Sequence, residues 1–505
     1  MADEILAYYE KELAYIRQQG ARFAEEHPKI AGRLGISADV IEDPHVSRLI
    51  EGVAYLNARL HHKLDDDFSE ISDALLNVVY PHYQKPIPSC SIVQFLPHEG
   101  QLQAKYKIPA RTLLETPQFQ GEKCRFTTVY ETELLPVTVQ EAKMLGRPFA
   151  TPGANQVRGA NSVLHLRLKT FDNTIKICDF SPDFFRFFLK GQDQYVNPLY
   201  ELLLNETLSV VLAKTGADVT PQYLPKNSIA PVGFNESEGL FPYPASSSVG
   251  YRLLSEFFSF PEKFLFFDIN GCRDYLKDYQ EELNIYIYLK STSSDLERHL
   301  SSANFLLGCT PAVNLFPHQV EPIQVNHKTT EYPVIPDVRR PTGYEVYSID
   351  EVVGLSSTGV KHKFLPLYGL KHQQIDLKHQ SYWSMHRRHA KQGLGLRDEA
   401  TDVYLSLADL NLNPNLPSDK TLLIKATCSN RNLPEKLPFN ADQPVLQCVE
   451  GSPPCRRIKC LTQPTRSLRP PMGNGARWRL ISRLNLNQLS LMGTGDALEA
   501  LKEIL

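Results

Sequence analysis

The chain has 505 residues, 42% of them hydrophobic and 22% charged, which is typical of a folded protein of about three domains. Its 54 basic and 57 acidic residues give a formal net charge of −3, so overall charge gives no reason to expect nucleic acid or an anionic membrane as a partner. No apolar run approaches the ~20 residues of a membrane span, no signal peptide is evident, and nine irregularly spaced cysteines favour reduced thiols in a cytoplasmic protein.

Helices are predicted in the first 80 residues, where acidic side chains outnumber basic ones. A first helix is expected from Asp3 toward His27, because its apolar residues recur at helical spacing. Pro28 ends it and begins a short helical turn, for which Gly35 supplies the C-terminal cap. These two elements lead into a longer helix.

The longer helix is predicted from Asp43 to Tyr80, with Asp43 as its N-cap, Pro44 in the first turn and Pro81 as its stop. Its apolar residues keep a period of about 3.6 and form a stripe along one face. The stripe that we assign to partner binding consists of Leu49, Val53, Leu56, Leu60, Leu64, Phe68, Ile71 and Leu75.

This stripe is longer than a local fold needs, since such a helix runs for roughly 50 Å. Two helices do not enclose their own apolar faces, because a stable bundle needs three or four. We therefore predict that the stripe packs against another chain in an intermolecular helical bundle. The alternative is a core helix of a single domain.

From Pro86 onward, short apolar runs separated by Pro, Gly and Asn indicate many strands. The clearest are residues 91–96, 125–139 and 162–170. Further strands are expected at residues 208–213, 264–269, 284–290, 344–353, 403–407 and 421–427. Residues 181–190, with four phenylalanines, are interpreted as a short buried helix. The chain stops at Leu505 inside an expected helix that starts at Asp496, which suggests a missing C-terminal piece.

The resulting fold class is α+β, in which a long-helix hairpin precedes at least two β-rich, sandwich-like domains. We expect three domains: residues 1–85, helical; residues 86–330, β-rich with short helices; and residues 331–505, a second β-rich domain truncated at its end. The second boundary is placed near a segment with three prolines and no helical period.

Enzyme motifs are absent from the sequence. It has no phosphate-binding G-x-x-x-x-G-K-[ST] loop, no G-x-G-x-x-G, no H-E-x-x-H and no G-x-S-x-G, so we expect no catalysis and no cofactor.

The best metal candidate is the histidine-rich stretch His362, His372, His379, His386 and His389. No cysteine or acidic residue lies at ligand spacing there, and a basic, solvated loop and helix start is the favoured interpretation. The same stretch has basic and aromatic residues, for which a protein contact is favoured over nucleic acid.

Two further groups of residues, three cysteines and three aspartates, lack the spacing of a metal or catalytic site. Cys448, Cys455 and Cys460 lack the C-x-x-C spacing of zinc ribbons, so reduced thiols are expected and no metal site is assigned. Asp65, Asp66 and Asp67 follow one another on a predicted helix, where successive side chains diverge by 100°. They do not converge on one substrate, and we interpret them as a solvated flank of the apolar stripe.

Several sequence blocks in the same order resemble the TssF family of the type VI secretion baseplate, which is related to the wedge proteins of contractile phages. Near the start these are Tyr8-Tyr9-Glu10-Lys11-Glu12-Leu13, Asp43-Pro44-His45-Val46 and Tyr80-Pro81-His82-Tyr83. Further blocks are residues 309–316, Arg431-Asn432-Leu433-Pro434 and residues 478–491. The resemblance covers nearly the whole chain.

The resemblance implies a structural subunit without enzymatic activity, metal or cofactor. Two copies of such a subunit would join one TssG in a wedge, with TssE and TssK as further partners, and six wedges would surround the spike and hub. The expected location is the cytoplasm, at the baseplate docked on the inner membrane, with no insertion into the membrane. An alternative within the same architecture is a wedge protein of a contractile phage or phage-like injection particle.

Overall fold

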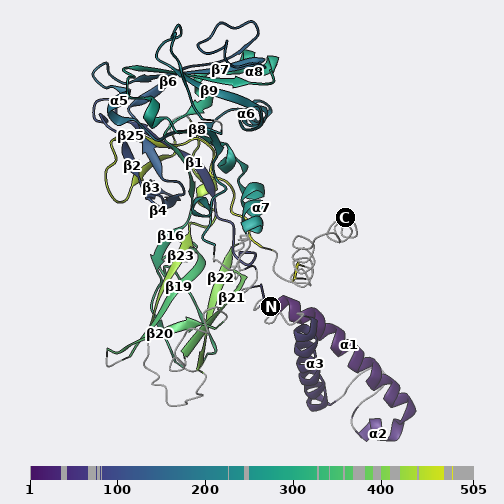
Figure 1. Cartoon of the computed structure of the whole chain (residues 1–505). Coiled ribbons are helices and arrows are strands. Elements are labelled where there is room, and N and C mark those ends of the chain that lie inside the picture. Colours follow the sequence, from purple (N-terminus) through teal and green to yellow (C-terminus); the bar gives the residue numbers. More distant parts are fainter. Residues whose placement is uncertain are drawn as a thin grey trace. The chain divides into compact units, whose positions relative to one another are not determined.

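The computed structural model describes residues 2–33, 35, 43–65, 75–76, 80, 82–225, 227–243, 249–326, 329–340, 342–356, 359–367, 381–390, 400–409, 421–440, 443–470 and 480–481. The chain divides into two compact units (Figure 1). Unit 1 comprises residues 1–84 and 470–505, and unit 2 comprises residues 85–469. Helices followed by many strands confirm the predicted α+β class.

Unit 1 contains α1 (Ala2–Glu26), α2 (Pro28–Arg33) and α3 (Pro44–Asp65). The predicted signals act as expected: α1 ends two residues before Pro28, and Gly35 takes a left-handed φ of 64°. Asp43 accepts a hydrogen bond through Oδ1 from the backbone N–H of His45 at 2.8 Å, as an N-cap does. Of the predicted helix beyond Asp65, residues 75 and 76 are helical, and residues 66–74 lie outside the described part.

A closed barrel forms the centre of unit 2. Around it the strands are β1 (Cys90–Pro97), β15 (Cys309–Val313), β4 (Glu122–Thr128), β3 (Leu113–Phe119), β24 (Val445–Cys448) and β25 (Cys455–Cys460). Phe95, Leu114 and Phe126 pack in its interior with Ile458. The barrel thus combines segments from the beginning, the middle and the end of unit 2.

Two antiparallel sheets pack beside the barrel and share one large core. The first has the order β10 (Gln222–Tyr223), β9 (Thr207–Ala213), β13 (Glu282–Leu289), β7 (Ser162–Thr170) and β6 (Val137–Gly146). The second has the order β11 (Ile229–Pro231), β12 (Phe266–Asn270), β8 (Phe184–Leu189) and β14 (Phe305–Leu306). A small sheet pairs β2 (Tyr106–Ile108) with β5 (Thr132–Leu134).

Short helices connect these strands. They are α5 (Ile177–Phe180), α6 (Asp193–Asn205), α7 (Val249–Ser259), α8 (Ser294–His299), η1 (Glu236–Glu238), η2 (Pro261–Phe264), η3 (Arg273–Tyr275), η4 (Ser302–Asn304) and η6 (Pro434–Lys436).

Two local predictions in this region are wrong. Residues 181–190 do not form a buried helix, because β8 pairs with β12 on one side and with β14 on the other. Aromatic residues favour strands, and Arg186 forms a bidentate pair with Asp268 directly across from it, at 2.8 and 2.7 Å. Residues 125–139 do not form one strand, since they contain the end of β4, all of β5 and the start of β6.

The remaining sheet has the order β16 (Phe316–Gln319), β23 (Thr421–Ser429), β19 (Glu345–Leu355), β20 (Lys361–Pro366), β21 (Ser381–His389), β22 (Thr401–Asp409) and β18 (Glu331–Pro333), with β17 (Ile323–Gln324) also paired to β23. Its core contains Val352, Leu405 and Ile424. The expectation of a loop and helix start over the histidine-rich stretch is wrong for residues 381–389, which form β21.

The domain boundaries near residues 85 and 330 stay predictions. The pairing of strands, however, crosses the second boundary in both directions. β24 and β25 lie far beyond residue 331, yet they close the barrel with β1 and β3. Likewise β16 lies before residue 331 and pairs with β23 of the other sheet. The chain therefore leaves the barrel region, builds the larger sheet, and returns.

Candidate partner-binding surface

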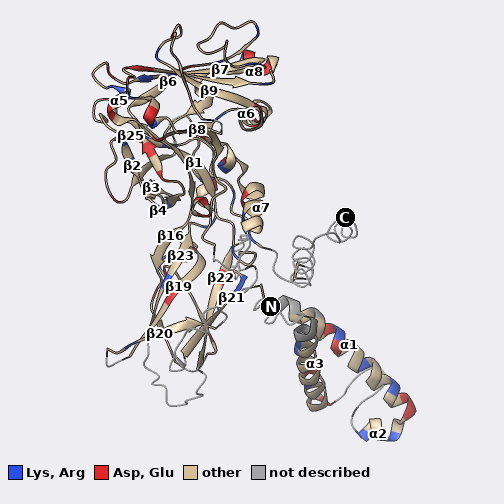
Figure 2. Ribbon diagram, in the orientation of Figure 1, with Lys and Arg blue, Asp and Glu red and all other residues tan. Residues whose placement is uncertain are grey.

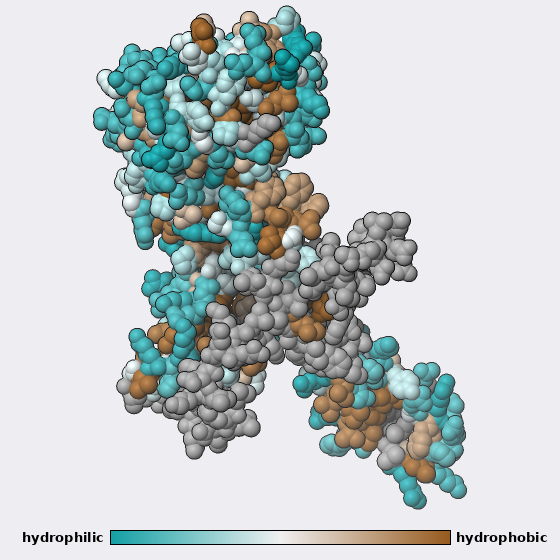
Figure 3. All heavy atoms as spheres, in the orientation of Figure 1, coloured by the Kyte–Doolittle hydropathy of each residue, from teal (hydrophilic) through white to brown (hydrophobic). Residues whose placement is uncertain are grey.

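Helix α3 exposes the apolar stripe that the sequence singles out. Leu49, Val53, Leu56 and Leu60 are 71%, 44%, 58% and 62% exposed. They recur every three or four residues, so they share one face of the helix. In Figure 3 hydrophobic atoms gather on this part of unit 1. Exposed apolar faces of this kind are characteristic of interaction surfaces, which makes this face a candidate.

The opposite side of α3 explains how the helix is held. Ala54 and Ala58, one turn apart, are completely buried. Their small side chains let α1 pack close to α3, and the Glu12 carboxylate of α1 lies 3.5 Å from the His61 ring. Helix α3 therefore uses its alanines for packing within the unit and leaves its larger aliphatic residues exposed.

The remaining residues of the predicted stripe are described only in part. Leu75 is helical and exposed. Leu64 belongs to α3, but its side chain lies outside the described part, as do Phe68 and Ile71. Asp65 ends α3, while Asp66 and Asp67 are outside that part too. Partner binding by the whole stripe therefore stays a prediction.

The histidine-rich stretch does not gather ligands where it is described. His386 and His389 lie three residues apart on β21, so their side chains point to opposite faces of the sheet. Between them Arg387 is half-buried and donates to the carbonyls of Val346 and Tyr347 at 2.8 and 2.9 Å. Within the described residues no group of three or more His, Cys, Asp or Glu is placed to hold a metal ion. His372 and His379 lie outside them.

The three cysteines near the end of unit 2 are partly or fully buried thiols. Burial raises the pKa of Cys448 and of Cys460 to about 11, and it raises the pKa of Cys455 as well. The thiolate is the form that binds metal and attacks electrophiles. Burial therefore favours the protonated thiol over the thiolate at all three positions.

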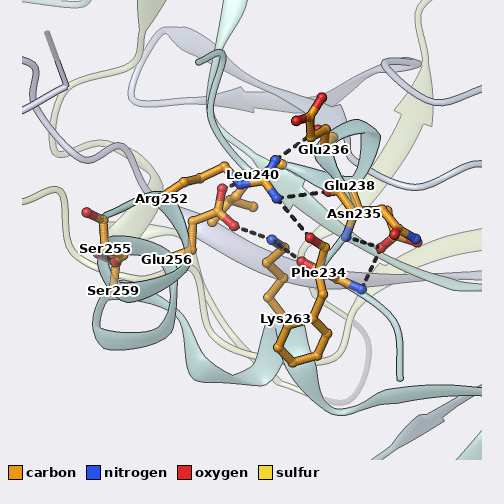
Figure 4. Close-up of polar contacts among 12 residues, drawn as sticks. Phe234, Asn235, Glu236, Glu238, Leu240, Arg252, Ser255, Glu256, Ser259 and Lys263 are labelled. Atoms are coloured by element: carbon orange, nitrogen blue, oxygen red, sulfur yellow. Dashed lines mark hydrogen bonds and ion pairs between the residues drawn. The ribbon is translucent and has the colours of Figure 1, made fainter. Parts of the chain in front are cut away.

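A buried ion pair stabilises the base of α7 (Figure 4). The Lys263 ammonium contacts the Glu256 carboxylate, and both side chains are fully buried. Lys263 also donates to the Gly233 carbonyl at 3.0 Å, while Glu256 accepts from the backbone N–H of Leu240 at 2.7 Å. Burial lowers the pKa of Lys263, although Glu256 opposes this effect. Sequence reasoning missed this cluster, because its members are separated by loops.

Basic and acidic side chains are interspersed along both units (Figure 2). The described helices contain no segment long and apolar enough to cross a membrane. Two grooves border the barrel, and each is lined by both apolar and polar side chains.

A family model described as "Type VI secretion system, TssF" matches residues 1–505. A curated relative, the type VI secretion system component TssF1 of Pseudomonas aeruginosa PAO1, is 34% identical over 521 residues, covering 100% of this chain and 83% of the relative. The chain belongs to the TssF family. This confirms the resemblance of the sequence blocks.

Solved structures show that the TssF fold is shared. A chain of the cryo-electron microscopy structure of the type VI secretion TssK–TssF–TssG baseplate subcomplex matches with a TM-score of 0.71 and 24% identity, over 90% of this chain and 81% of that one. A chain of the baseplate complex from the type VI secretion system matches with a TM-score of 0.56 and 24% identity, over 95% and 80%.

Proposed function

We propose that this TssF-family chain is a structural subunit of a type VI secretion baseplate wedge, on which the tail tube and sheath assemble. The observation that carries the proposal is the exposed apolar stripe of α3, which needs a partner. Membership of the TssF family supports the baseplate as the setting. It favours this setting over a contractile phage or phage-like injection particle.

TssG is the partner that we propose for the α3 stripe, together with a second copy of this chain. A similar chain occurs in a complex with TssK and TssG, which supports TssG and TssK as partners. We extend the proposal to TssE, to neighbouring wedges and to the spike and hub, and we place the chain in the cytoplasm at the inner-membrane-docked baseplate. The mechanism is assembly, not catalysis.

The test introduces charge into the stripe with the double substitution Leu56→Asp and Leu60→Asp. Both side chains are exposed in the chain by itself, so its thermal unfolding should change little. In the complex the same carboxylates would be buried without partners, at a cost of several kcal/mol. We expect co-purification with co-expressed TssG to fall at least tenfold.

The matched control is Gln18→Asp with Gln19→Asp, two exposed positions on α1. It adds the same charge to the same unit outside the stripe, and TssG recovery should stay normal. If the Leu56 and Leu60 variant retained TssG at the yield of the control, the stripe would not be the interface. Mass determination of the complex then tests the expected two copies per TssG.

The absence of catalysis is tested separately, through the metal alternative centred on His379, His386 and His389. Elemental analysis of the purified chain should show no stoichiometric zinc, copper or iron. One equivalent of a transition metal, lost in a variant with His386→Ala and His389→Ala, would contradict a purely structural role.

A further inference from the structure

Helix α7 is amphipathic, but it turns its charged residues to the protein interior and its apolar residues to solvent. Its two charged residues, Arg252 and Glu256, point inward and are buried. Its apolar residues point outward: Phe258 is 80% exposed, Leu254 58% and Phe257 52%. These three share one face, because they are spaced by three and four residues. A surface helix normally turns its apolar face to the core, so this orientation needs a cause.

The cause of the orientation is the polar network under the helix (Figure 4). The Arg252 guanidinium donates to the carbonyls of Glu236, Phe234 and Asn235 at 2.9, 3.1 and 2.9 Å. Glu256 contacts Lys263 and the Leu240 N–H. Rotating the helix to bury its aromatic face would carry Arg252 and Glu256 outward and leave the Lys263 ammonium buried without its partner, at a cost of several kcal/mol. The network therefore fixes α7 with its apolar residues outward.

The exposed residues form one surface, here called the α7 patch: Phe234, Leu254, Phe257 and Phe258. Two of its rings pack on Phe264 in tilted arrangements, Phe257 with centroids 5.9 Å apart and Phe234 at 5.1 Å. In Figure 3 hydrophobic atoms cover the surface at α7. Large apolar side chains that are exposed and held rigid are characteristic of interface anchors.

The charges at the border of the α7 patch indicate what covers it. Within residues 227–243 and 249–270, the basic side chains are Arg252 and Lys263, and both are buried. Glu236 is exposed beside Phe234, and Glu262 is partly exposed directly after the helix. Arg111, an exposed residue in the turn between β2 and β3, reaches this loop and donates to the Gly239 carbonyl at 2.9 Å. Apart from Arg111, the accessible charges in these two ranges that border the rings are acidic, namely Glu236 and Glu262.

We infer that the α7 patch is a second docking surface, whose occupant is another baseplate subunit with an apolar surface bordered by Lys or Arg. An anionic membrane is disfavoured, since it would meet carboxylates instead of the basic residues that interfacial helices use. Two copies of this chain meeting patch to patch are disfavoured as well, because their acidic borders would repel. The inference rests on the proposed assembly role, but it concerns a surface in unit 2 instead of the α3 stripe.

The test places a photoreactive residue in the complex. Phe258→p-benzoylphenylalanine is introduced into the full chain, co-expressed with TssG and TssK, and irradiated. We expect an adduct with TssG or TssK, and the crosslinked peptide should be apolar with Lys or Arg nearby. The control is the same substitution at Val219, which is 92% exposed in a loop, and it should give no such adduct.

Adducts only within the chain, with a second copy or with lipid would overturn the inference, and so would no adduct above the Val219 control. A double variant, Leu254→Ser with Phe258→Ser, gives an independent readout. Its melting temperature should match that of the wild-type chain, while its affinity for the crosslinked subunit should fall about tenfold or more. Unchanged affinity would contradict the assignment.

Failure of the inference and failure of the proposed function are distinguishable. If the α7 variants bind normally while the Leu56 and Leu60 variant loses TssG, the assembly role stands and the α7 patch is not an interface. Flotation with phosphatidylglycerol vesicles should show no binding. Flotation of the wild-type chain that is lost in the Leu254 and Phe258 variant would assign the patch to a lipid surface instead.

Discussion

At the residue scale, a buried carboxylate joins three segments of unit 2. Glu345 on β19 is almost fully buried, accepts from the Arg469 guanidinium at 2.8 Å, and accepts from the Thr401 N–H and hydroxyl at 3.0 and 2.6 Å. Burial acts to raise the pKa of Glu345, but the bonds from Arg469 and Thr401 outweigh it and lower the pKa below the ordinary value of 4.5. The ion pair thus fixes the last residue of the unit to its larger sheet.

Replacing Arg469 with Met should therefore destabilise unit 2 by about 3–5 kcal/mol, because it leaves the Glu345 charge buried without its partner. Urea unfolding measures this loss of stability, with Arg456→Met at an exposed arginine as a control that should stay within about 0.5 kcal/mol of wild type.

The pH dependence of the stability that Glu345 contributes has a definite sign. A carboxylate whose pKa is lowered in the folded state contributes stability above pH 4.5 and loses it as the pH falls further, and Arg469→Met should lose this slope. An equal loss of stability in both variants would contradict the special role of this pair.

At the element scale, α3 divides its residues by size, with alanines inside and leucines outside. Ala58 is completely buried, so replacing it with Leu should force α1 away and cost about 1–3 kcal/mol. Hydrogen exchange should show faster exchange along α1. The control is Leu49→Ala, at an exposed position, which should leave exchange in α1 unchanged. Equal exchange in both variants would mean that the alanines do not set the α1–α3 distance.

The same helix shows how much of the structure and of the candidate site the sequence could predict. Its N-cap at Asp43 and the helical spacing of Leu49, Val53, Leu56 and Leu60 follow from local rules, and both are found where expected. Periodicity locates an apolar face, but it does not say whether that face is covered inside the chain. For β8 the local pattern predicted a helix instead of a strand, because the conformation of its phenylalanines is set by pairing with strands that are distant in the sequence. The α7 patch was missed for a related reason: its orientation is set by Lys263 and the loop around Gly233, not by its own spacing.

At the scale of the whole molecule, the barrel needs its last two strands. A fragment spanning residues 85–469 contains all of unit 2, whereas one ending at residue 440 lacks β24 and β25. Without them β1 and β3 lose partners, and the barrel core around Phe95 and Leu114 is exposed. We expect the longer fragment to be soluble with a cooperative melting transition, and the shorter one to aggregate. A shorter fragment that melts as cooperatively as the longer one would show that the strands are dispensable.

The two ends of unit 2 also meet. Ile87 and Leu468 exchange backbone hydrogen bonds of 2.7 and 2.9 Å in an antiparallel bridge, so the chain enters and leaves this unit at one place. In terms of covalent architecture, unit 2 is an insertion within the sequence of unit 1. Such an insertion can be treated as a cassette: a short linker between residues 84 and 470 would suffice to excise it, and a related body with adjoining ends could take its place.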